Sequence, residues 1–419
     1  MPQSVGRRSK LANLSLLIVG FGLGQGSIFL AQTWLVAEGR LHLLAEFGSL
    51  YAFAVLGVFI VETASTITLS RHVSAQRARQ AKSGELWEIL WSTALVRLGL
   101  ALLIIALALA CLPFIPSGFA RNYALAVLPC YFLWSISSAG LLDGLNRSGI
   151  SGLTGIFPYI CSAAALPFAA PLDDATAGLI LGLAFSLGSA LTMATQWVAL
   201  LAMGYRPQGV RLGRALIAAT GREILAVLFT TLPGQAFYRI QILLAGLFLG
   251  PTATGLFIYA KQTINAVNML FVFIRRVEFP HLVEQIAKHN RNPADATFKA
   301  FRLGLLISLI CAIALVIAGT VGSNLLPPQF EEPLRTIAIF SPLVLTLALS
   351  SAYNQGLFAV DMASYAARIS LLAATSGAVL SYLLVLWMGT PGFVIAEVGM
   401  HLLVGGLAAR LLLTKTVSG

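Results

Sequence analysis

The chain has 419 residues, of which 58% are hydrophobic and only 10% charged, and its mean hydropathy is +0.86. Soluble domains carry about a quarter charged residues, so this composition excludes a soluble globular protein and indicates a chain built for lipid. The net charge of +11 is dispersed over short loops, which favours membrane lipid headgroups as partners and argues against nucleic acid.

Twelve apolar stretches reach the roughly 20 residues that a helix needs to cross a bilayer. Transmembrane β-strands are about half as long and alternate apolar with polar residues, which these stretches do not. We therefore expect an all-α, polytopic membrane bundle of about 12 transmembrane helices. The predicted spans are 12–36, 45–69, 87–112, 119–142, 150–171, 176–203, 222–249, 253–277, 299–321, 334–358, 364–388 and 391–413.

The basic residues between the spans predict the orientation of the chain. Of the 27 Lys and Arg residues, 21 fall in alternate gaps, and the remaining gaps hold only Arg40, Arg121 and Arg335. By the positive-inside rule we expect the basic gaps to be cytoplasmic, together with both termini. The basic gaps are the N-terminus, 71–86, 143–149, 204–222, 275–302, the gap at Arg368, and the C-terminal tail.

The loops and a weak repeat predict two similar halves. The longest basic loops follow the second and the eighth span, and residues 45–52 can be laid on residues 252–260, where each segment opens the second span of its half. We expect an N-terminal six-helix lobe over 1–210 and a C-terminal six-helix lobe over 211–419. Duplicated halves usually place the substrate path at their interface.

Two cations are predicted at the middle of the membrane. Arg239 lies eleven residues before Gly250 and Lys261 eleven residues after it, so both sit about 15 Å from the outer surface. Intramembrane ionisable groups mark a functional site by default. Each cation is therefore expected to face an anionic substrate, or else to be neutralised by an acid elsewhere in the bundle, since the seventh and eighth spans contain no acid.

Polar residues share the helix faces of these cations. Gln235 and Tyr238 precede Arg239 by four residues and by one, while Asn265 and Asn268 follow Lys261 at i+4 and i+7, with Gln262 beside them. In the first span, Gln25 lies among four glycines at alternate positions, which permit bending or close packing. All six polar residues are candidates for substrate binding.

Two further pairs are candidates for ion coupling or for structure. Glu62 and Arg97 have opposite charge at a shared depth, which suits a buried ion pair or a coupling site. Glu397 and His401 are related by i, i+4, which suits a proton relay or a helix–helix hydrogen bond. The sequence carries no nucleophile–base–acid constellation and no nucleotide-binding motif, so we expect neither an enzyme nor a cofactor or metal.

The segments Leu44–Tyr51 and Leu249–Phe257, together with the twelve-span layout, resemble the polysaccharide transporter (Wzx-type) branch of the flippase superfamily that also contains lipid II flippases and multidrug exporters. The resemblance implies a V-shaped pair of six-helix lobes around a central cavity lined by spans 1, 2, 7 and 8. It also implies an undecaprenyl-pyrophosphate-linked oligosaccharide as substrate, with Arg239 and Lys261 at the pyrophosphate. The first lobe departs from symmetrical phosphate binding, because spans 1 and 2 offer few cations.

The expected function is a flippase that moves this lipid-linked oligosaccharide from the cytoplasmic to the periplasmic leaflet by alternating access, with ion coupling. A glycan polymerase or a glycosyltransferase is an expected partner. A cation-coupled multidrug exporter is one alternative, although such a site should favour carboxylates. A membrane-embedded glycan polymerase or ligase is another, although it needs a sizeable outer loop; a structural scaffold would need no polar residues at the midplane.

Overall fold

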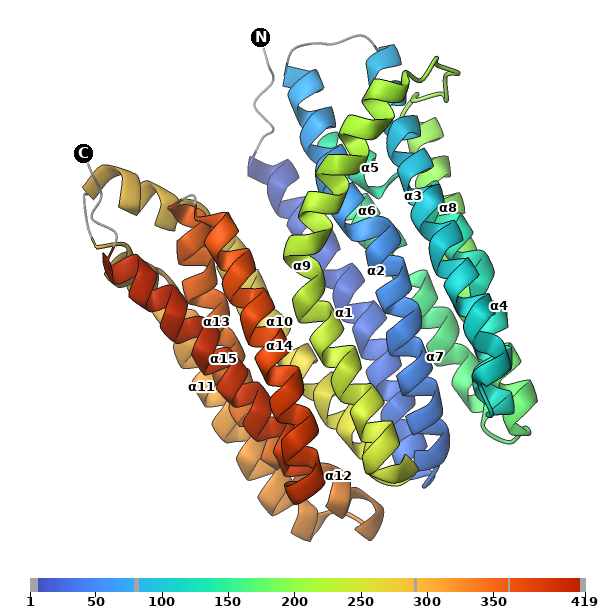
Figure 1. The fold of residues 1–419 in the computed structure, drawn as a ribbon, viewed down its shortest axis with the longest axis vertical. Coiled ribbons are helices and arrows are strands. Elements are labelled where there is room, and N and C mark those ends of the chain that lie inside the picture. The colour runs from blue at the N-terminus through green and yellow to red at the C-terminus, as the bar shows by residue number, and fades with distance from the viewer. Residues whose placement is uncertain (1–6, 79–82, 290–291, 361, 415–419) are drawn as a thin grey trace. The chain divides into compact units, whose positions relative to one another are not determined.

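The computed structural model describes residues 7–78, 83–289, 292–360 and 362–414 (Figure 1). Within these ranges every regular element is a helix, which confirms the all-α membrane bundle. The α-helices are α1 (Arg7–Ala37), α2 (Leu41–Ala78), α3 (Ser83–Cys111), α4 (Gly118–Ser135), α5 (Ala139–Gly144), α6 (Ser148–Thr154), α7 (Phe157–Ala169), α8 (Asp174–Ala202), α9 (Arg214–Phe248), α10 (Gly250–His289), α11 (Pro293–Leu325), α12 (Glu331–Phe340), α13 (Pro342–Ala359), α14 (Ala363–Met388) and α15 (Thr390–Thr414).

The helices account for the predicted spans. In the described part of the chain, ten spans are long and apolar enough to cross a membrane, and α9 adds an eleventh if its two halves form one span. The twelfth predicted span, 253–277, lies within α10, whose apolar run is interrupted by the polar residues around Lys261.

Three of the predicted spans consist of two consecutive helices. Span 150–171 is α6 followed by α7, and span 334–358 is α12 followed by α13. In both spans a proline occupies the first turn of the second helix, where the N–H that proline lacks would have no partner within the helix. Span 119–142 breaks between α4 and α5. There the indole of Trp197 donates to the carbonyl of Ile136 and Arg97 donates to the carbonyl of Ser137. These donors satisfy backbone groups that the break exposes inside the apolar layer.

The chain forms two compact units. The first unit contains residues Met1–Trp34 and Leu50–Thr231, and the second contains Leu35–Ser49 and Leu232–Gly419. The chain therefore crosses between the units within α1, within α2 and within α9. The division into lobes 1–210 and 211–419 stays a prediction.

Within the first unit, α4 and α8 pack side by side through small residues (Figure 1). Gly178 and Gly182, one turn apart on α8, lie against the backbone carbonyls of Phe119 and Tyr123 on α4. One turn further, Ser186 donates to the carbonyl of Ala126 at 2.6 Å. Small residues at this spacing let two backbones approach closely, which is how helices associate when lipid is the solvent.

The second unit has its core where α9, α11, α13, α14 and α15 meet. Phe237 of α9 is buried with alanines of α14 and with Met400 and Val404 of α15. Near the other end of the unit, the ring of Phe257 on α10 lies against the ring of Phe393 on α15, with 5.1 Å between the ring centroids and the rings tilted by 55°. This contact holds α10 against α15, and both helices carry polar residues of the candidate site.

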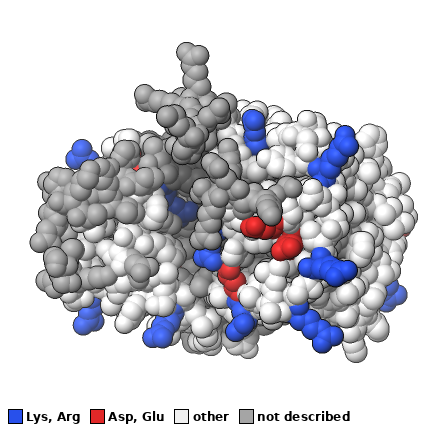
Figure 2. All heavy atoms as spheres, turned by 90° about the horizontal axis from the view of Figure 1, so that it is seen from above, with Lys and Arg blue, Asp and Glu red and all other residues white. Residues whose placement is uncertain are grey.

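The end of the molecule that carries the α2–α3 and α8–α9 connections shows dispersed Lys and Arg side chains and one small group of acidic side chains (Figure 2). In the first unit, Arg71 and His72 of α2 both contact the carboxylate of Glu223 on α9. The basic residues Arg79, Lys82, Arg291 and Lys415 lie outside the described residues, as do both chain ends. The cytoplasmic location of the termini and of the basic loops stays a prediction.

Candidate functional site

The turn between α9 and α10 places the two predicted cations together. α9 ends at Phe248 and α10 begins at Gly250, whose φ of +79° allows the chain to reverse with one intervening residue. The side chains at equal distance from this turn then lie at equal depth. The ring of Tyr238 lies 5.1 Å from Arg239 Cζ and 5.3 Å from Lys261 Nζ, so one aromatic ring contacts both cations.

Arg239 is buried, with 7% of its surface exposed. Its Nη1 donates to the side-chain oxygen of Gln235 at 2.7 Å and to the backbone carbonyl of the same residue at 3.2 Å. The predicted i, i+4 face of α9 therefore forms a contact, in which Gln235 and Tyr238 both approach the guanidinium. A neutral amide and an aromatic ring thus help to orient this cation.

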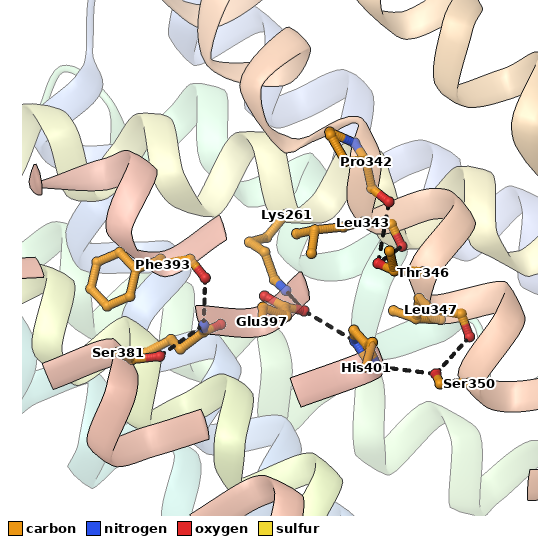
Figure 3. Close-up of polar contacts among 11 residues, drawn as sticks. Lys261, Pro342, Leu343, Thr346, Leu347, Ser350, Ser381, Phe393, Glu397 and His401 are labelled. Atoms are coloured by element: carbon orange, nitrogen blue, oxygen red, sulfur yellow. Dashed lines mark hydrogen bonds and ion pairs between the residues drawn. The ribbon is translucent and has the colours of Figure 1, made fainter. Parts of the chain in front are cut away.

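Lys261 is 3% exposed and its ammonium lies 2.5 Å from Oε1 of Glu397, which is equally buried (Figure 3). The sequence left two possibilities open for Lys261, an anionic substrate or an acid elsewhere in the bundle, and the structure shows such an acid. It comes from α15, because Glu397 lies 136 residues further along the chain. A buried ammonium without such a counter-ion would be strongly disfavoured.

Glu397 continues the contacts to His401 and α13. His401 Nε2 lies 3.7 Å from Glu397 Oε1, and its Nδ1 lies 3.1 Å from the hydroxyl of Ser350 (Figure 3). The second carboxylate oxygen, Oε2, is buried without a hydrogen-bond partner in the described part of the chain. The predicted Glu397–His401 pair is thus joined to Lys261, which the sequence did not connect with it.

We refer to this set of residues as the charged chain. It runs through the second unit from α9 across α10 and α15 to α13, and consists of Gln235, Arg239, Tyr238, Lys261, Glu397, His401 and Ser350. It contains two basic side chains, Arg239 and Lys261, and one carboxylate, Glu397.

The other predicted binding residues are Gln262, Asn265 and Asn268, which follow Lys261 on α10, and Gln25 on α1. Gln262 and Asn265 are half-buried on α10, and Asn268 is buried with its Oδ1 unpartnered among the described residues. Gln25 is half-buried on α1 in the first unit. Their part in substrate binding stays a prediction.

Arg97 and Glu62 lie in the first unit and are joined through a hydroxyl. Arg97 is fully buried; its Nε donates to Ser65 at 2.6 Å and its Nη2 to Thr66 at 3.1 Å, and Thr66 in turn donates to the carboxylate of Glu62. The sequence predicted either a buried ion pair or a coupling site at these two residues. The hydroxyl stands between the charges because Thr66 lies one turn from Glu62 on the same face of α2.

Two polar residues of the second unit were not predicted. Gln241 is buried on α9, two residues beyond Arg239, and its amide donates to the hydroxyl of Ser381 and to the carbonyl of Phe393 (Figure 3). Gln241 thus ties α9 to α14 and α15 beside the charged chain. A glutamine inside an apolar span is unusual, so the sequence could have identified Gln241. The second unpredicted residue is Ser350, and a single serine in a span gives no comparable indication.

Comparison with known proteins identifies the fold. No family model and no curated protein sequence matches the chain. Among solved structures, an inward-facing multidrug resistance MATE family transporter of the MOP superfamily matches with a TM-score of 0.74 at 15% identity, covering 98% of this chain and 100% of that one. The chain shares the fold of this transporter.

Two further solved structures share this fold. One is named for a lipid substrate and the other for the reversed polarity of its binding pocket. The lipid II flippase MurJ, in an inward closed conformation, matches with a TM-score of 0.63 at 13% identity over 92% of this chain and 87% of that one. A MOP superfamily transporter from Pyrococcus furiosus, described by the reverse polarity of its binding pocket, matches with a TM-score of 0.65 at 13% identity over 98% and 97%. The shared fold thus hosts more than one kind of substrate.

Proposed function

We propose that this protein is a flippase that moves a lipid-linked oligosaccharide with an anionic pyrophosphate from the cytoplasmic to the periplasmic leaflet by alternating access. The fold, shared with transporters that include a lipid II flippase, supports transport. The observation that carries the substrate class is the pair of buried basic side chains, Arg239 and Lys261, which contact the same aromatic ring, with Glu397 as the one carboxylate of the charged chain.

Arg239 is the residue that we expect to bind the pyrophosphate. Its planar guanidinium suits bidentate binding of phosphate oxygens, and Gln235 and Tyr238 orient it. Lys261 contributes positive charge, although Glu397 neutralises it in this conformation. Gln262, Asn265 and Asn268 follow on α10 as hydrogen-bond partners for sugar hydroxyls, because amide side chains both donate and accept.

The test is transport by purified protein in proteoliposomes. The substrate is a polyprenyl-pyrophosphoryl oligosaccharide with a fluorophore on the sugar, and a membrane-impermeant reductant added outside reports how fast the sugar reaches the outer leaflet. We expect Arg239→Ala to lower this rate at least tenfold, and Arg239→Lys to lower it less, because the charge remains but the fork of donors is lost.

Arg335→Ala is the matched control. Arg335 lies on α12 of the same unit, exposed and paired with Glu331 at 2.8 Å, so its removal deletes an arginine without touching the charged chain. We expect this variant to transport like the unmodified protein. Unchanged transport by folded Arg239→Ala would contradict the proposed substrate site.

A multidrug exporter is the second candidate, because the MATE transporters of this fold are multidrug transporters. Its site would have to attract cationic drugs, and in the charged chain only Glu397 could do so. Drug-resistance assays in cells that lack their own exporters separate the two functions. Resistance that depends on Glu397, without glycolipid transport, would favour the exporter.

A further inference from the structure

Glu62 of the first unit is a carboxylate that no cation contacts directly in the described part of the chain. It lies on α2 inside the apolar span Leu41–Ser74. Arg97 can only donate hydrogen bonds, so Thr66 accepts from Arg97 Nη2 at 3.1 Å and gives its own proton to Glu62 Oε1. These two successive hydrogen bonds orient the carboxylate and leave its second oxygen, Oε2, outside the contact.

Oε2 of Glu62 is an accessible acceptor. The residue is half-buried, and no described residue donates a hydrogen bond to Oε2. Oε2 is also not one of the fully enclosed side-chain atoms that lack a partner. Ionisable groups inside a membrane span face a partner, a water-filled cavity or a ligand, because lipid would leave them unsolvated. Glu62 therefore gives one oxygen to Thr66 and keeps the other for water or a ligand.

The face of α2 that carries Glu62 differs from the face with the exposed apolar side chains. Phe53 and Ile67 are 39% and 51% exposed, as suits side chains that face lipid. At about 100° per residue, they lie about 180° and 140° around the helix from Glu62. The side chains within about 80° of Glu62 on one side of it are half-buried, namely Val55, Phe59, Thr66 and Ser70. Glu62 thus belongs to a half-open face of α2 that is separate from the lipid-facing one.

The charges around Oε2 favour an uncharged hydroxyl over a cation as ligand. Glu62 and Arg97 have opposite charges, and only the hydroxyl of Thr66 separates them. A metal ion or an ammonium at Oε2 would be repelled by the guanidinium across this short distance in a medium of low dielectric. A hydroxyl group donates to a carboxylate oxygen without adding charge. Sugars carry such hydroxyls in numbers, and they also have apolar ring faces.

Phe59 supplies an apolar surface for such a ring face. It precedes Glu62 by three residues, so the two side chains are neighbours on the helix surface, and both are half-buried. An aromatic ring beside a hydrogen-bond acceptor combines an apolar contact with a directional polar one, which is the usual composition of a small-molecule site.

We propose that Glu62 is a glycan-binding residue of the first unit. Its Oε2 accepts hydrogen bonds from hydroxyl groups of the oligosaccharide, Phe59 packs against the ring of the same sugar, and Thr66 is the positioning residue that orients the carboxylate. The inference rests on the proposed function, because the glycan is that of the proposed substrate. It assigns the sugar to Glu62, whereas the pyrophosphate is assigned to Arg239.

The experiment compares two lipids that differ only in the sugar. Native mass spectrometry of the purified full-length protein measures the affinity for the polyprenyl-pyrophosphoryl oligosaccharide of the transport assay and for the same polyprenyl pyrophosphate without sugar. We expect Glu62→Gln to weaken binding of the glycolipid about tenfold, because a charged acceptor becomes a neutral one. Binding of the sugarless lipid should not change. Glutamine keeps the shape of the side chain and an oxygen for Thr66, so the fold is retained.

Two further variants separate positioning from packing. Thr66→Ser keeps the hydroxyl between Arg97 and Glu62 and should bind the glycolipid like the unmodified protein. Thr66→Val removes the hydroxyl and should weaken the glycolipid but not the sugarless lipid, with thermal unfolding as the check on the fold. Glu88→Gln is the matched control, because Glu88 is a half-buried acid on α3 of the same unit. We expect it to bind both lipids normally.

The outcomes distinguish this inference from the proposed function. Arg239→Ala should weaken both lipids, because both carry the pyrophosphate. If it does so while Glu62→Gln binds the glycolipid normally, or weakens both lipids equally, only the glycan site is overturned. Glycolipid binding that requires sodium, and loses this requirement in Glu62→Gln, would place a cation at Oε2 and overturn it as well. If the unmodified protein binds neither lipid, the proposed function fails and the glycan site fails with it.

Discussion

At the scale of single residues, the protein accommodates buried cations in two ways. Arg97 is fully buried and donates to Ser65, to Thr66 and to the carbonyl of Ser137, so its charge is spread over neutral acceptors. Lys261 instead has one carboxylate, Glu397, in direct contact. The first arrangement satisfies a carbonyl at the break between two helices, whereas the second is a buried ion pair between two helices.

The buried pair predicts an asymmetric response to substitution. We expect Glu397→Gln or Lys261→Met alone to destabilise the protein by about 3–5 kcal/mol, because each leaves an uncompensated buried charge. The double variant removes both charges and should recover most of that loss. Thermal unfolding in detergent, followed by tryptophan fluorescence, measures all three variants.

The exposed pair on α12 provides the comparison for this cycle. Glu331→Gln breaks the Arg335–Glu331 contact, in which 61% and 45% of the two side chains are exposed, and should cost no more than about 1 kcal/mol. If the double variant at Lys261 and Glu397 were as unstable as the sum of the single ones, the two residues would not be acting as a pair.

At the scale of helices, close approach of backbones decides which elements pair. The glycines of the weak repeat show this most clearly within the second unit. A Cβ at Gly255 would lie 2.8 Å from the carbonyl of Leu41, and one at Gly48 would lie 2.7 Å from the side chain of Ile258. The first copy of the repeat, on α2, and the second copy, on α10, therefore contact each other. The repeat lies where these two helices cross.

The α4–α8 contact predicts a strong effect of size at one position. A Cβ at Gly182 would lie 2.7 Å from the backbone carbonyl of Tyr123, so Gly182→Leu must push the two helices apart. We expect a loss of about 1–3 kcal/mol, seen as a lower thermal unfolding temperature. Gly99→Leu is the control, because no atom lies within 4 Å of a Cβ at this position on α3 of the same unit. An equal loss in both variants would show that helix packing is not the cause.

At the scale of the whole molecule, the alternation of basic and non-basic loops predicts which side each loop faces. Arg206 lies in a predicted cytoplasmic loop and Arg335 in a predicted periplasmic one, and both side chains are exposed. We expect Arg206→Cys, in a background without the four native cysteines, to react with an impermeant thiol reagent only after the cells are opened. Arg335→Cys should react in intact cells with a permeable outer membrane; the reverse pattern would invert the proposed direction of transport.

The sequence by itself determined the helical class, most of the span positions and the equal depth of Arg239 and Lys261. These follow from local quantities: the length of an apolar run, the cost of burying charge, and the distance of a residue from a turn. Gly250 and the ring of Tyr238 bear out the depth argument.

Only the tertiary structure decided which charges meet. Glu397 pairs with Lys261 from 136 residues away, Thr66 stands between Glu62 and Arg97, and Ser350 contacts the imidazole of His401. Such contacts depend on which helices pack together and on their rotation about their axes. In lipid, all the spans are apolar alike, so the sequence of one span does not specify its neighbour. The sequence therefore predicts the orientation of the chain from its basic loops. It does not identify the counter-ions of the charged residues inside the predicted spans.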